Sequence, residues 1–172
     1  MLARLDNLSY YRRTKDKISR LYDTTGCGNT LDFTNTHVTT FAVDSLRYWA
    51  KRIGIDGFRF DLAATLARLD GEFTRYHPFL YALRSDMLLG NLKMIMEPWD
   101  CGPNGWRTGE FGIPFAEWND RFRDCTRKFW LTDVDRMRGG EYGEMTMQEM
   151  ATRLCGSSDL FATDPAAVRP RP

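Results

Sequence analysis

"GIDGFRFDLA" at residues 54–63 decides the fold, because it reads as a buried strand that nevertheless carries two charges. Successive side chains of a strand point to opposite faces, so Arg59 and Asp61 share one face while Phe58 and Phe60 share the other. If the aromatic rings pack against covering helices, the charged pair faces the other side of the sheet. Either that side is solvated, or the pair takes part in chemistry.

A second stretch, NLKMIMEPWD at residues 91–100, has the same form: an apolar strand that ends in the carboxylate of Glu97. Pro98 stops this strand because it has no N–H to donate to a sheet ladder. Helical patterns precede, separate and follow the two strands. This alternation predicts βαβ units with a parallel sheet, which is an α/β fold.

The expected elements follow from the apolar spacing and from helix start and stop signals. The apolar stripe from Val38 to Ile53 predicts a helix that is capped by Asn35 or Thr36 and ends at Gly54. The other expected elements are a strand at 55–61, a helical piece at 63–69, a helix at 78–89, a strand at 92–97, a loop at 98–114, a helix at 115–129 and a last helix from Thr146 to Gly156.

Asp61 and Glu97 stand at the carboxyl ends of the two predicted strands, where the ligand sites of parallel sheets lie. A neighbouring Arg59 keeps Asp61 ionised, as a nucleophile requires. The apolar strand neighbours of Glu97 favour its protonated form. One ionised and one protonated carboxyl is the pairing that cleaves glycosidic bonds. Spacing alone leaves a second interpretation open, in which Arg59 and Asp61 form a solvated ion pair and Glu97 is simply a polar residue that ends its strand.

Composition excludes several other classes of protein. The chain has 172 residues, enough for one domain with a core, and a net charge of +1. A net charge this close to zero argues against a protein that binds nucleic acid or an acidic membrane surface. The basic and aromatic stretch SYYRRTKDK at residues 9–17 is therefore interpreted as an ordinary part of the protein surface. No stretch approaches the roughly 20 apolar residues of a membrane span. TGCGNT at residues 25–30 lacks the lysine of a phosphate-binding loop.

Neither the cysteines nor the histidines are spaced like a metal or redox site. His37 and His77 are far apart in the sequence, so no metal site and no cofactor are expected. The N-terminal stretch has no secretory signal. We therefore expect free thiols in a reducing cytoplasm. The four cysteines are Cys27, Cys101, Cys125 and Cys155.

Several motifs resemble those of a known family. DGFRFDLA at residues 56–63 and MEPWD at residues 96–100 resemble the two central catalytic motifs of the α-amylase superfamily. YDTTGCGNT at 22–30, AEWNDRFRDCTRKFW at 116–130 and LCGSSDLF at 154–161 are similar to bacterial glycogen debranching enzymes of the isoamylase type. The resemblance is colinear from about Leu5 to Asp164.

This resemblance implies a (β/α)8 barrel that hydrolyses the α-1,6 branch linkages of glycogen with retention of configuration. By matching motifs, Asp61 is the expected nucleophile, Glu97 the general acid/base, and Arg59 the residue that holds Asp61 ionised. The expected partner is an α-glucan. The residues expected to line the glucan cleft are Gly26, Cys27, Gly28, Asn29, Trp99 and Asp100.

The sequence also departs from the family. Family members carry an Asn-His motif on an earlier strand and a His-Asp motif, with a third catalytic carboxylate, on a later one. Here His37 precedes Val38 and His77 precedes Pro78, so neither motif is present. A complete barrel takes about 250 residues. We therefore expect a partial barrel of central βα units.

The expected partial catalytic domain covers residues 1–164, and residues 165–172 are expected to be a divergent, disordered tail. Because a catalytic carboxylate and an earlier strand are missing, we expect this chain to be inactive by itself. The alternative interpretation is a vestigial fragment that binds glucan without catalysis.

Overall fold

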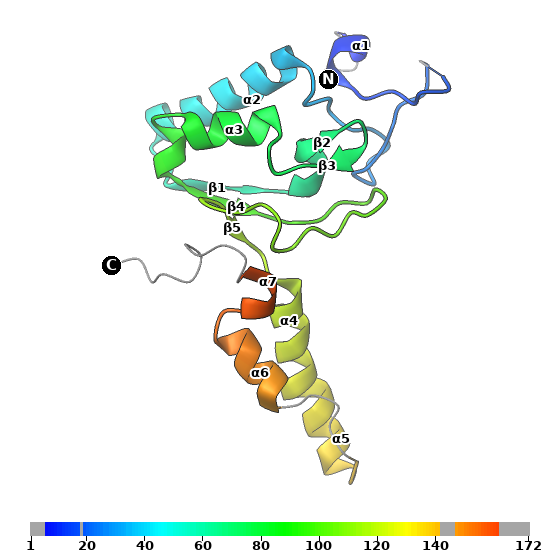
Figure 1. Cartoon of the computed structure of the whole chain (residues 1–172), viewed down its shortest axis with the longest axis vertical. Helices are drawn as coiled ribbons and strands as arrows, with labels where there is room; N and C mark the ends of the chain where they lie inside the picture. The colour runs from blue at the N-terminus through cyan, green and yellow to red at the C-terminus, as the bar shows by residue number, and fades with distance from the viewer. Residues whose placement is uncertain (1–5, 18, 142–146, 162–172) are drawn as a thin grey trace. The chain divides into compact units, whose positions relative to one another are not determined.

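The computed structural model describes residues 6–17, 19–141 and 147–161. The chain divides into two compact units, residues 1–117 and 118–172, which are described separately (Figure 1). The predicted capping residue Thr146 and the predicted tail at 165–172 lie outside the described residues. The single domain expected for residues 1–164 stays a prediction.

The first unit is built around a three-stranded sheet with strand order β1–β4–β5. Its strands are β1 (Gly57–Phe60), β4 (Lys93–Met96) and β5 (Ala116–Glu117). Both pairs are parallel, and Phe60 lies opposite Met96 in the register. The predicted α/β class with a parallel sheet is confirmed. Gly57 permits the close approach of β1 to β4, since a Cβ there would lie 2.4 Å from the carbonyl oxygen of Lys93.

Two helices lie on the same side of this sheet, α2 (Thr36–Tyr48) and α3 (Pro78–Ser85) (Figure 1). The α2 helix continues through a wider turn, Trp49–Ile53, and its start and end agree with the predicted ones. The Asn35 side chain accepts a hydrogen bond from the backbone of His37, and Gly54 ends the helix with a positive φ of 80°.

The aromatic face of β1 packs against these helices, as the alternation predicts. Phe60 is buried, and its ring lies 6.2 Å from that of Phe79 on α3. Arg59 belongs to the opposite face of the strand, away from this core. The core residues of the first unit are Phe33, Val38, Val43, Phe60, Ala63, Ala64, Ala67, Phe79, Leu80, Leu83, Leu89, Met94, Met96, Phe111 and Phe115.

The helical piece predicted at 63–69 is wrong in its last two residues. A short 3-10 helix covers Ala63–Ala67, and then β2 (Arg68–Leu69) and β3 (Glu72–Phe73) form an antiparallel hairpin. Asp70 and Gly71 turn the chain with positive φ angles of 49° and 90°. An Asp-Gly pair with two positive φ angles is a two-residue hairpin turn, so this dipeptide was an overlooked signal.

The helix predicted at 78–89 ends earlier, at Ser85. The carboxylate of Asp86 accepts hydrogen bonds from the backbone N–H groups of Leu88 and Leu89, and so starts a separate 3-10 turn, Leu89–Asn91. At the N-terminal end of the unit, α1 is a single turn, Asn7–Tyr10.

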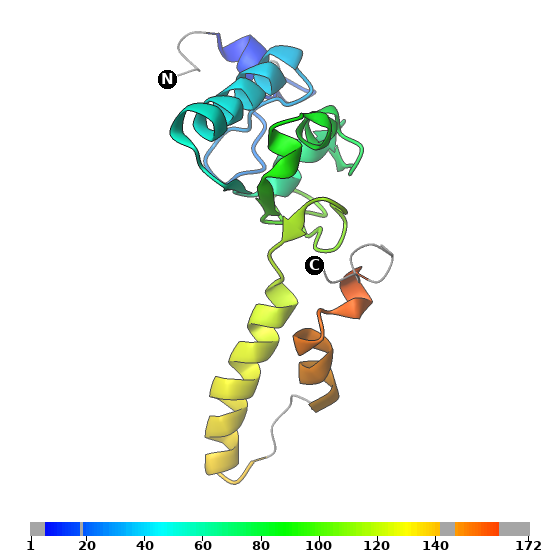
Figure 2. The ribbon, with the colours of Figure 1, turned by 90° about the vertical axis from the view of Figure 1, so that its left-hand side faces the viewer.

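The described part of the second unit is helical, with a long helix (yellow) and shorter helical segments (orange) in Figure 2. The long helix runs without a break through α4 (Asp120–Arg127), a wider turn (Lys128–Asp133) and α5 (Val134–Arg138). Against α4 packs α6 (Met147–Leu154), which α7 (Ser158–Phe161) follows. The Sγ atom of Cys125 lies 3.7 Å from the Sδ atom of Met150 at this contact.

The helix predicted at 115–129 begins too early. Phe115 is buried in the core of the first unit, and the next two residues form β5. The helix starts only after Asn119, whose side chain accepts a hydrogen bond from the backbone of Phe122. Pairing of residues 116–117 with β4 decided this boundary, and no local pattern encodes that contact.

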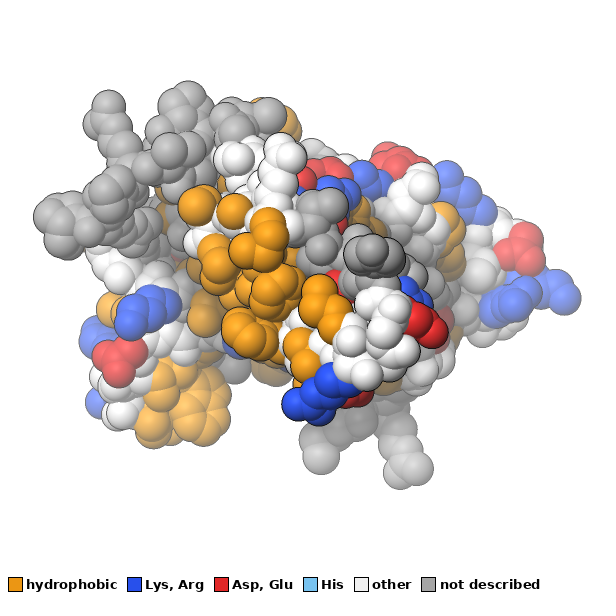
Figure 3. All heavy atoms as spheres, turned by 90° about the horizontal axis from the view of Figure 1, so that it is seen from below, with side chains coloured by type: hydrophobic (Ala, Val, Ile, Leu, Met, Phe, Trp, Pro, Cys, Tyr) orange, Lys and Arg blue, Asp and Glu red, His pale blue; other side chains and the backbone are white. Residues whose placement is uncertain are grey.

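Some large apolar side chains remain exposed, as Figure 3 shows for one face of the molecule. In the second unit, the most exposed include Trp130, Leu131, Met137, Met147 and Leu154. Within the described ranges, no helix combines the length and apolar character needed to cross a membrane.

Candidate active site

Asp61 and Glu97 directly follow the paired residues Phe60 and Met96, so they leave the same ends of adjacent parallel strands. The ladder continues past the strands, because the backbone N–H of Glu97 donates to the carbonyl oxygen of Phe60 at 3.0 Å. The N–H of Ala63 donates to the carbonyl oxygen of Glu97 at 2.8 Å. The predicted placement of the two carboxylates is confirmed.

Arg59 bridges both carboxylates. Its Nη1 atom contacts Oδ1 of Asp61, as predicted, and its Nη2 atom lies 2.9 Å from Oε1 of Glu97. The Asp61 side chain is 73% exposed, whereas the Glu97 side chain is only 11% exposed. One carboxylate is therefore open to solvent, the other is enclosed, and the same guanidinium holds both.

The second oxygen of Glu97 has a backbone partner. Oε2 accepts a hydrogen bond of 2.6 Å from the N–H of Leu62. Leu62 has a positive φ of 44°, which is uncommon for a residue with a side chain. Such backbone conformations persist where surrounding contacts determine them, and they cluster at functional sites. The unusual turn after Asp61 thus aims an N–H group at Glu97.

The surroundings of Glu97 are only partly as expected. Met94 and Met96 on its strand are buried, in agreement with an apolar setting. However, its carboxylate contacts a guanidinium and an amide rather than apolar groups alone. The apolar strand neighbours are as expected, and Arg59, which reaches across from the neighbouring strand, adds a charged contact that the sequence analysis did not include.

The carboxylate of Asp23 organises the loop that carries Gly26, Cys27, Gly28 and Asn29. It accepts hydrogen bonds from the backbone N–H groups of Thr25, Gly26 and Gly28 and from the Thr25 hydroxyl. These bonds, the one from the Thr25 backbone first, lower the pKa of Asp23 below its ordinary value. The residues from Gly26 to Gly28 are exposed, and Asn29 is half-buried.

This loop contacts the segment after Glu97. The N–H of Cys101 donates to the carbonyl oxygen of Thr24 at 2.9 Å. The Sγ atom of Cys101 lies 3.6 Å from the position that a Cβ would take at Gly26. This loop, far away in the sequence, therefore contacts the chain four residues beyond Glu97.

Trp99 and Asp100 differ in accessibility. Trp99 is half-buried. The Asp100 side chain is fully enclosed and forms a two-pronged ion pair with Arg68, at 2.7 and 2.8 Å. It also accepts a hydrogen bond from the N–H of Gly102. In this structure the Asp100 carboxylate anchors its own loop.

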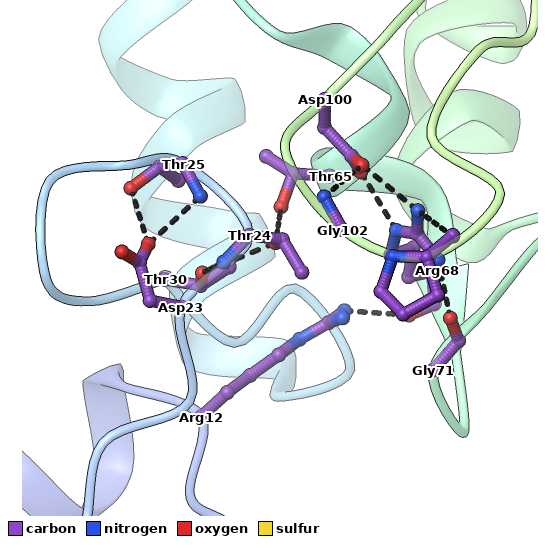
Figure 4. A network of polar contacts seen from close by, with 11 residues as sticks. Arg12, Asp23, Thr24, Thr25, Thr30, Thr65, Arg68, Gly71, Asp100 and Gly102 are labelled. Atoms are coloured by element: carbon purple, nitrogen blue, oxygen red, sulfur yellow. Dashed lines mark hydrogen bonds and ion pairs between the residues drawn. The ribbon is translucent and has the colours of Figure 1, made fainter.

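Arg68 and Arg12 are structural parts of the site that the sequence analysis missed. Arg68 joins Asp100 to the carbonyl oxygens of Gly71 and Pro103, and Arg12 donates to the carbonyl oxygen of Arg68 (Figure 4). The hydroxyls of Thr24, Thr30 and Thr65 form a buried cluster beside them. An arginine inside the apolar run LAATLARL was the available signal, because buried charges require partners.

Metal ligation has no evident place here. Among the described residues, no group of three or more His, Cys, Asp or Glu side chains has the arrangement needed to hold a metal ion.

Comparison with known proteins bears on what this arrangement does. The chain is 41% identical over 160 residues to a glycogen debranching enzyme of Cronobacter sakazakii, a match covering 93% of this chain and 22% of that protein. It is 42% identical over 163 residues to one of Klebsiella pneumoniae, covering 95% and 23%. This chain is related to bacterial glycogen debranching enzymes. The chain spans under a quarter of the length of these relatives, and no family model matches it.

Solved structures agree with this relationship. The fold is similar to a pullulanase from Anoxybacillus sp. LM18-11, with a TM-score of 0.63 and 27% identity over 88% of this chain and 21% of that one. The same enzyme complexed with maltotetraose matches with a TM-score of 0.61 and 26% identity, covering 88% and 22%. The resemblance read from the sequence motifs is therefore confirmed at the level of relatives, while residue roles stay predictions.

Proposed function

We propose that this chain forms part of the catalytic centre of a retaining glycoside hydrolase that cleaves α-1,6 branch linkages of glycogen or related α-glucans. The observation that carries the proposal is the pair Asp61 and Glu97, which leave the same ends of adjacent parallel strands and share Arg59. Similarity to glycogen debranching enzymes supports the substrate class. As part of the proposal, the parallel sheet belongs to a (β/α)8 barrel of the isoamylase type.

Asp61 is the proposed nucleophile. Its carboxylate attacks the anomeric carbon as the bond to the glycosidic oxygen breaks, and Glu97 gives its proton to that oxygen. A covalent glycosyl ester on Asp61 results. Water then attacks the same carbon, Glu97 takes a proton from this water, and Asp61 is released with the configuration retained. Exposure of Asp61 and enclosure of Glu97 suit an attacking group and a proton donor respectively.

Arg59 supports retention over inversion. Retaining enzymes hold their carboxyl groups about 5–5.5 Å apart, and inverting enzymes about 6.5–9.5 Å apart to admit a water molecule. A single guanidinium that contacts both Asp61 and Glu97 favours the shorter spacing.

Glucan contacts are proposed for the exposed loop Gly26–Asn29 and for Trp99. The loop offers backbone polar groups, and the half-buried Trp99 offers an aromatic face to a sugar ring. For Asp100, the enclosed side chain favours a positioning role over direct contact with glucan. Cytoplasmic location is also proposed, since the exposed residues Cys27, Cys101 and Cys155 are free thiols.

A chimeric enzyme tests the proposal. The matched 160 residues of this chain replace the corresponding segment of the Cronobacter sakazakii relative, and release of linear chains from glycogen is measured. We expect activity, and we expect Asp61→Asn or Glu97→Gln to lower kcat by about 10³-fold or more while glucan binding persists. Asp44→Asn, an exposed carboxylate on α2, is the matched control and should have no effect.

The outcomes separate the two interpretations. Turnover that survives Asp61→Asn would refute the assignment of the nucleophile. A correctly folded chimera that binds glucan but does not turn over, before any substitution, would instead favour the vestigial glucan-binding interpretation.

A further inference from the structure

A pocket with a volume of about 430 Å³ lies in the first unit. None of Arg59, Asp61 and Glu97 lines it, although Arg12 belongs both to its wall and to the buried network of Arg68 and Asp100. Its volume is within the range of about 300–1,000 Å³ that is typical of small-molecule sites. The lining residues are Arg12, Arg13, Thr14, Lys15, Tyr22, Asp32, Thr34, Asp70 and Gly71.

Two cations of this pocket have no carboxylate partner in the described chain. Arg12 is already engaged, since it lies 3.6 Å from the carboxylate of Asp32 and donates to the carbonyl oxygen of Arg68. Arg13 and Lys15 form no ion pair with any described residue, and the Nε atom of Arg13 is buried without a hydrogen-bond partner. An anion placed between Arg13 and Lys15 would give both side chains a negatively charged partner.

The rest of the lining suits hydroxyl groups. Asp70 is exposed at the hairpin turn and makes no ion pair within the described part of the chain, so its carboxylate can accept from a ligand. Thr14, Thr34 and Tyr22 contribute hydroxyl groups, and Tyr22 adds an aromatic face. With three cations and two carboxylates, the lining carries one net positive charge. This combination fits a ligand with one anionic group and several hydroxyls.

We propose that this pocket binds the phosphate monoester of a small polyhydroxylated molecule, for which a hexose phosphate is the best match in size. Arg13 and Lys15 hold the phosphate oxygens by charge-assisted hydrogen bonds. Asp70 and the threonine hydroxyls hold the sugar hydroxyls. Inorganic phosphate alone would leave most of the 430 Å³ empty and would leave Asp70 and the threonine hydroxyls without a ligand group to bind.

The pocket wall is connected to the loop that follows Glu97. Arg12, on the wall, donates to the carbonyl oxygen of Arg68, and the Arg68 guanidinium pairs with Asp100 (Figure 4). A ligand beside Arg12 therefore adds contacts to one end of a buried network whose other end is three residues from Glu97.

Isothermal titration calorimetry of the 172-residue chain tests the proposal, with glucose 1-phosphate, glucose and inorganic phosphate as probes. We expect saturable binding of glucose 1-phosphate, at least about tenfold tighter than either of the other probes. Arg13→Gln and Lys15→Gln should each weaken it by about tenfold, the size of one charge-assisted hydrogen bond. Asp70→Asn should bring the affinity for glucose 1-phosphate close to that for inorganic phosphate.

The matched control is Lys17→Gln, which removes an equal charge from an exposed residue two positions beyond the pocket lining. It should leave the affinity unchanged. Any of three results would overturn the proposal: no binding of glucose 1-phosphate at about 10 mM, equal affinity for inorganic phosphate, or an equal loss from Lys17→Gln.

Discussion

Arg59 is the residue on which the two proposed catalytic groups depend. Its planar guanidinium contacts Asp61 with one nitrogen and Glu97 with another. A lysine would keep the charge but could not hold two carboxylates in fixed directions, because its ammonium group is a flexible point charge. The geometry of the pair therefore requires arginine, and not merely a cation.

We predict that Arg59→Lys in the chimeric enzyme lowers kcat by about 10²-fold, because it removes a preorganised electrostatic contact. Steady-state kinetics, which separates kcat from KM, measures the effect. Arg52→Lys, at an exposed position in the wider turn that extends α2, should match the parent. An unchanged kcat for Arg59→Lys would argue against its role.

At the same scale, Arg68 and Asp100 form an ion pair with no exposed side-chain surface. Arg68→Met leaves a buried carboxylate without its cation, and such a change costs about 3–5 kcal/mol. Urea unfolding at low protein concentration should report this loss. The double variant Arg68→Met/Asp100→Leu should recover most of it, since neither charge of this pair is then left without its partner. Arg123→Met, which breaks an exposed pair with Asp124, should cost no more than about 1 kcal/mol.

At the scale of elements, His77 caps the start of α3 from a buried position. Its Nδ1 atom accepts a hydrogen bond from the N–H of Phe79, and the ring is fully buried with Nε2 unpartnered. Burial first, and then the nearby positive charge of Arg12, lower the pKa of His77 to about 4. Protonation of the folded state therefore requires acid well below the ordinary pKa of a histidine.

This pKa predicts a pH dependence of stability with a definite sign. Between about pH 4 and 6.5 the unfolded chain binds more protons at His77 than the folded chain, so the free energy of unfolding rises with pH. The total effect is roughly 3 kcal/mol. His77→Asn keeps a helix-capping acceptor but does not titrate, so it should flatten the profile in this window. His37→Asn, at an exposed position, should leave the profile unchanged. A profile for His77→Asn that is as steep as that of the parent chain would contradict the prediction.

At the scale of the whole chain, exposed apolar side chains favour self-association in solution. Trp130 and Leu131, adjacent on the long helix of the second unit, are each 61% exposed. Exposed apolar surface of this kind promotes association. We predict concentration-dependent self-association of the 172-residue chain and binding of a hydrophobic dye.

Sedimentation velocity checks this prediction. The double variant Trp130→Gln/Leu131→Gln should shift the chain toward monomer, whereas Met87→Gln, at a single exposed apolar residue in the first unit, should not. A monomeric parent chain with a sharp, reversible thermal transition would contradict the expectation.

Much of the first unit could be predicted from the sequence, because its signals are local. The apolar stripe, the cap at Asn35 and Gly54 determined the α2 helix and its extension almost to the residue. Alternation in GFRF placed Phe60 in the core and Arg59 on the other face, and two strands that each end in a carboxylate brought Asp61 and Glu97 to one edge.

Only the tertiary structure decided how that edge is held. The N–H of Leu62 reaches Glu97 across 35 positions of sequence, and Arg68 reaches Asp100 across 32. The start of the long helix was likewise decided by pairing of β5 with β4. Local patterns report the conformational preferences of neighbouring residues, whereas these contacts depend on which distant groups the folded chain brings together. A buried polar group must find its partner there, and the sequence alone does not say which one it will be.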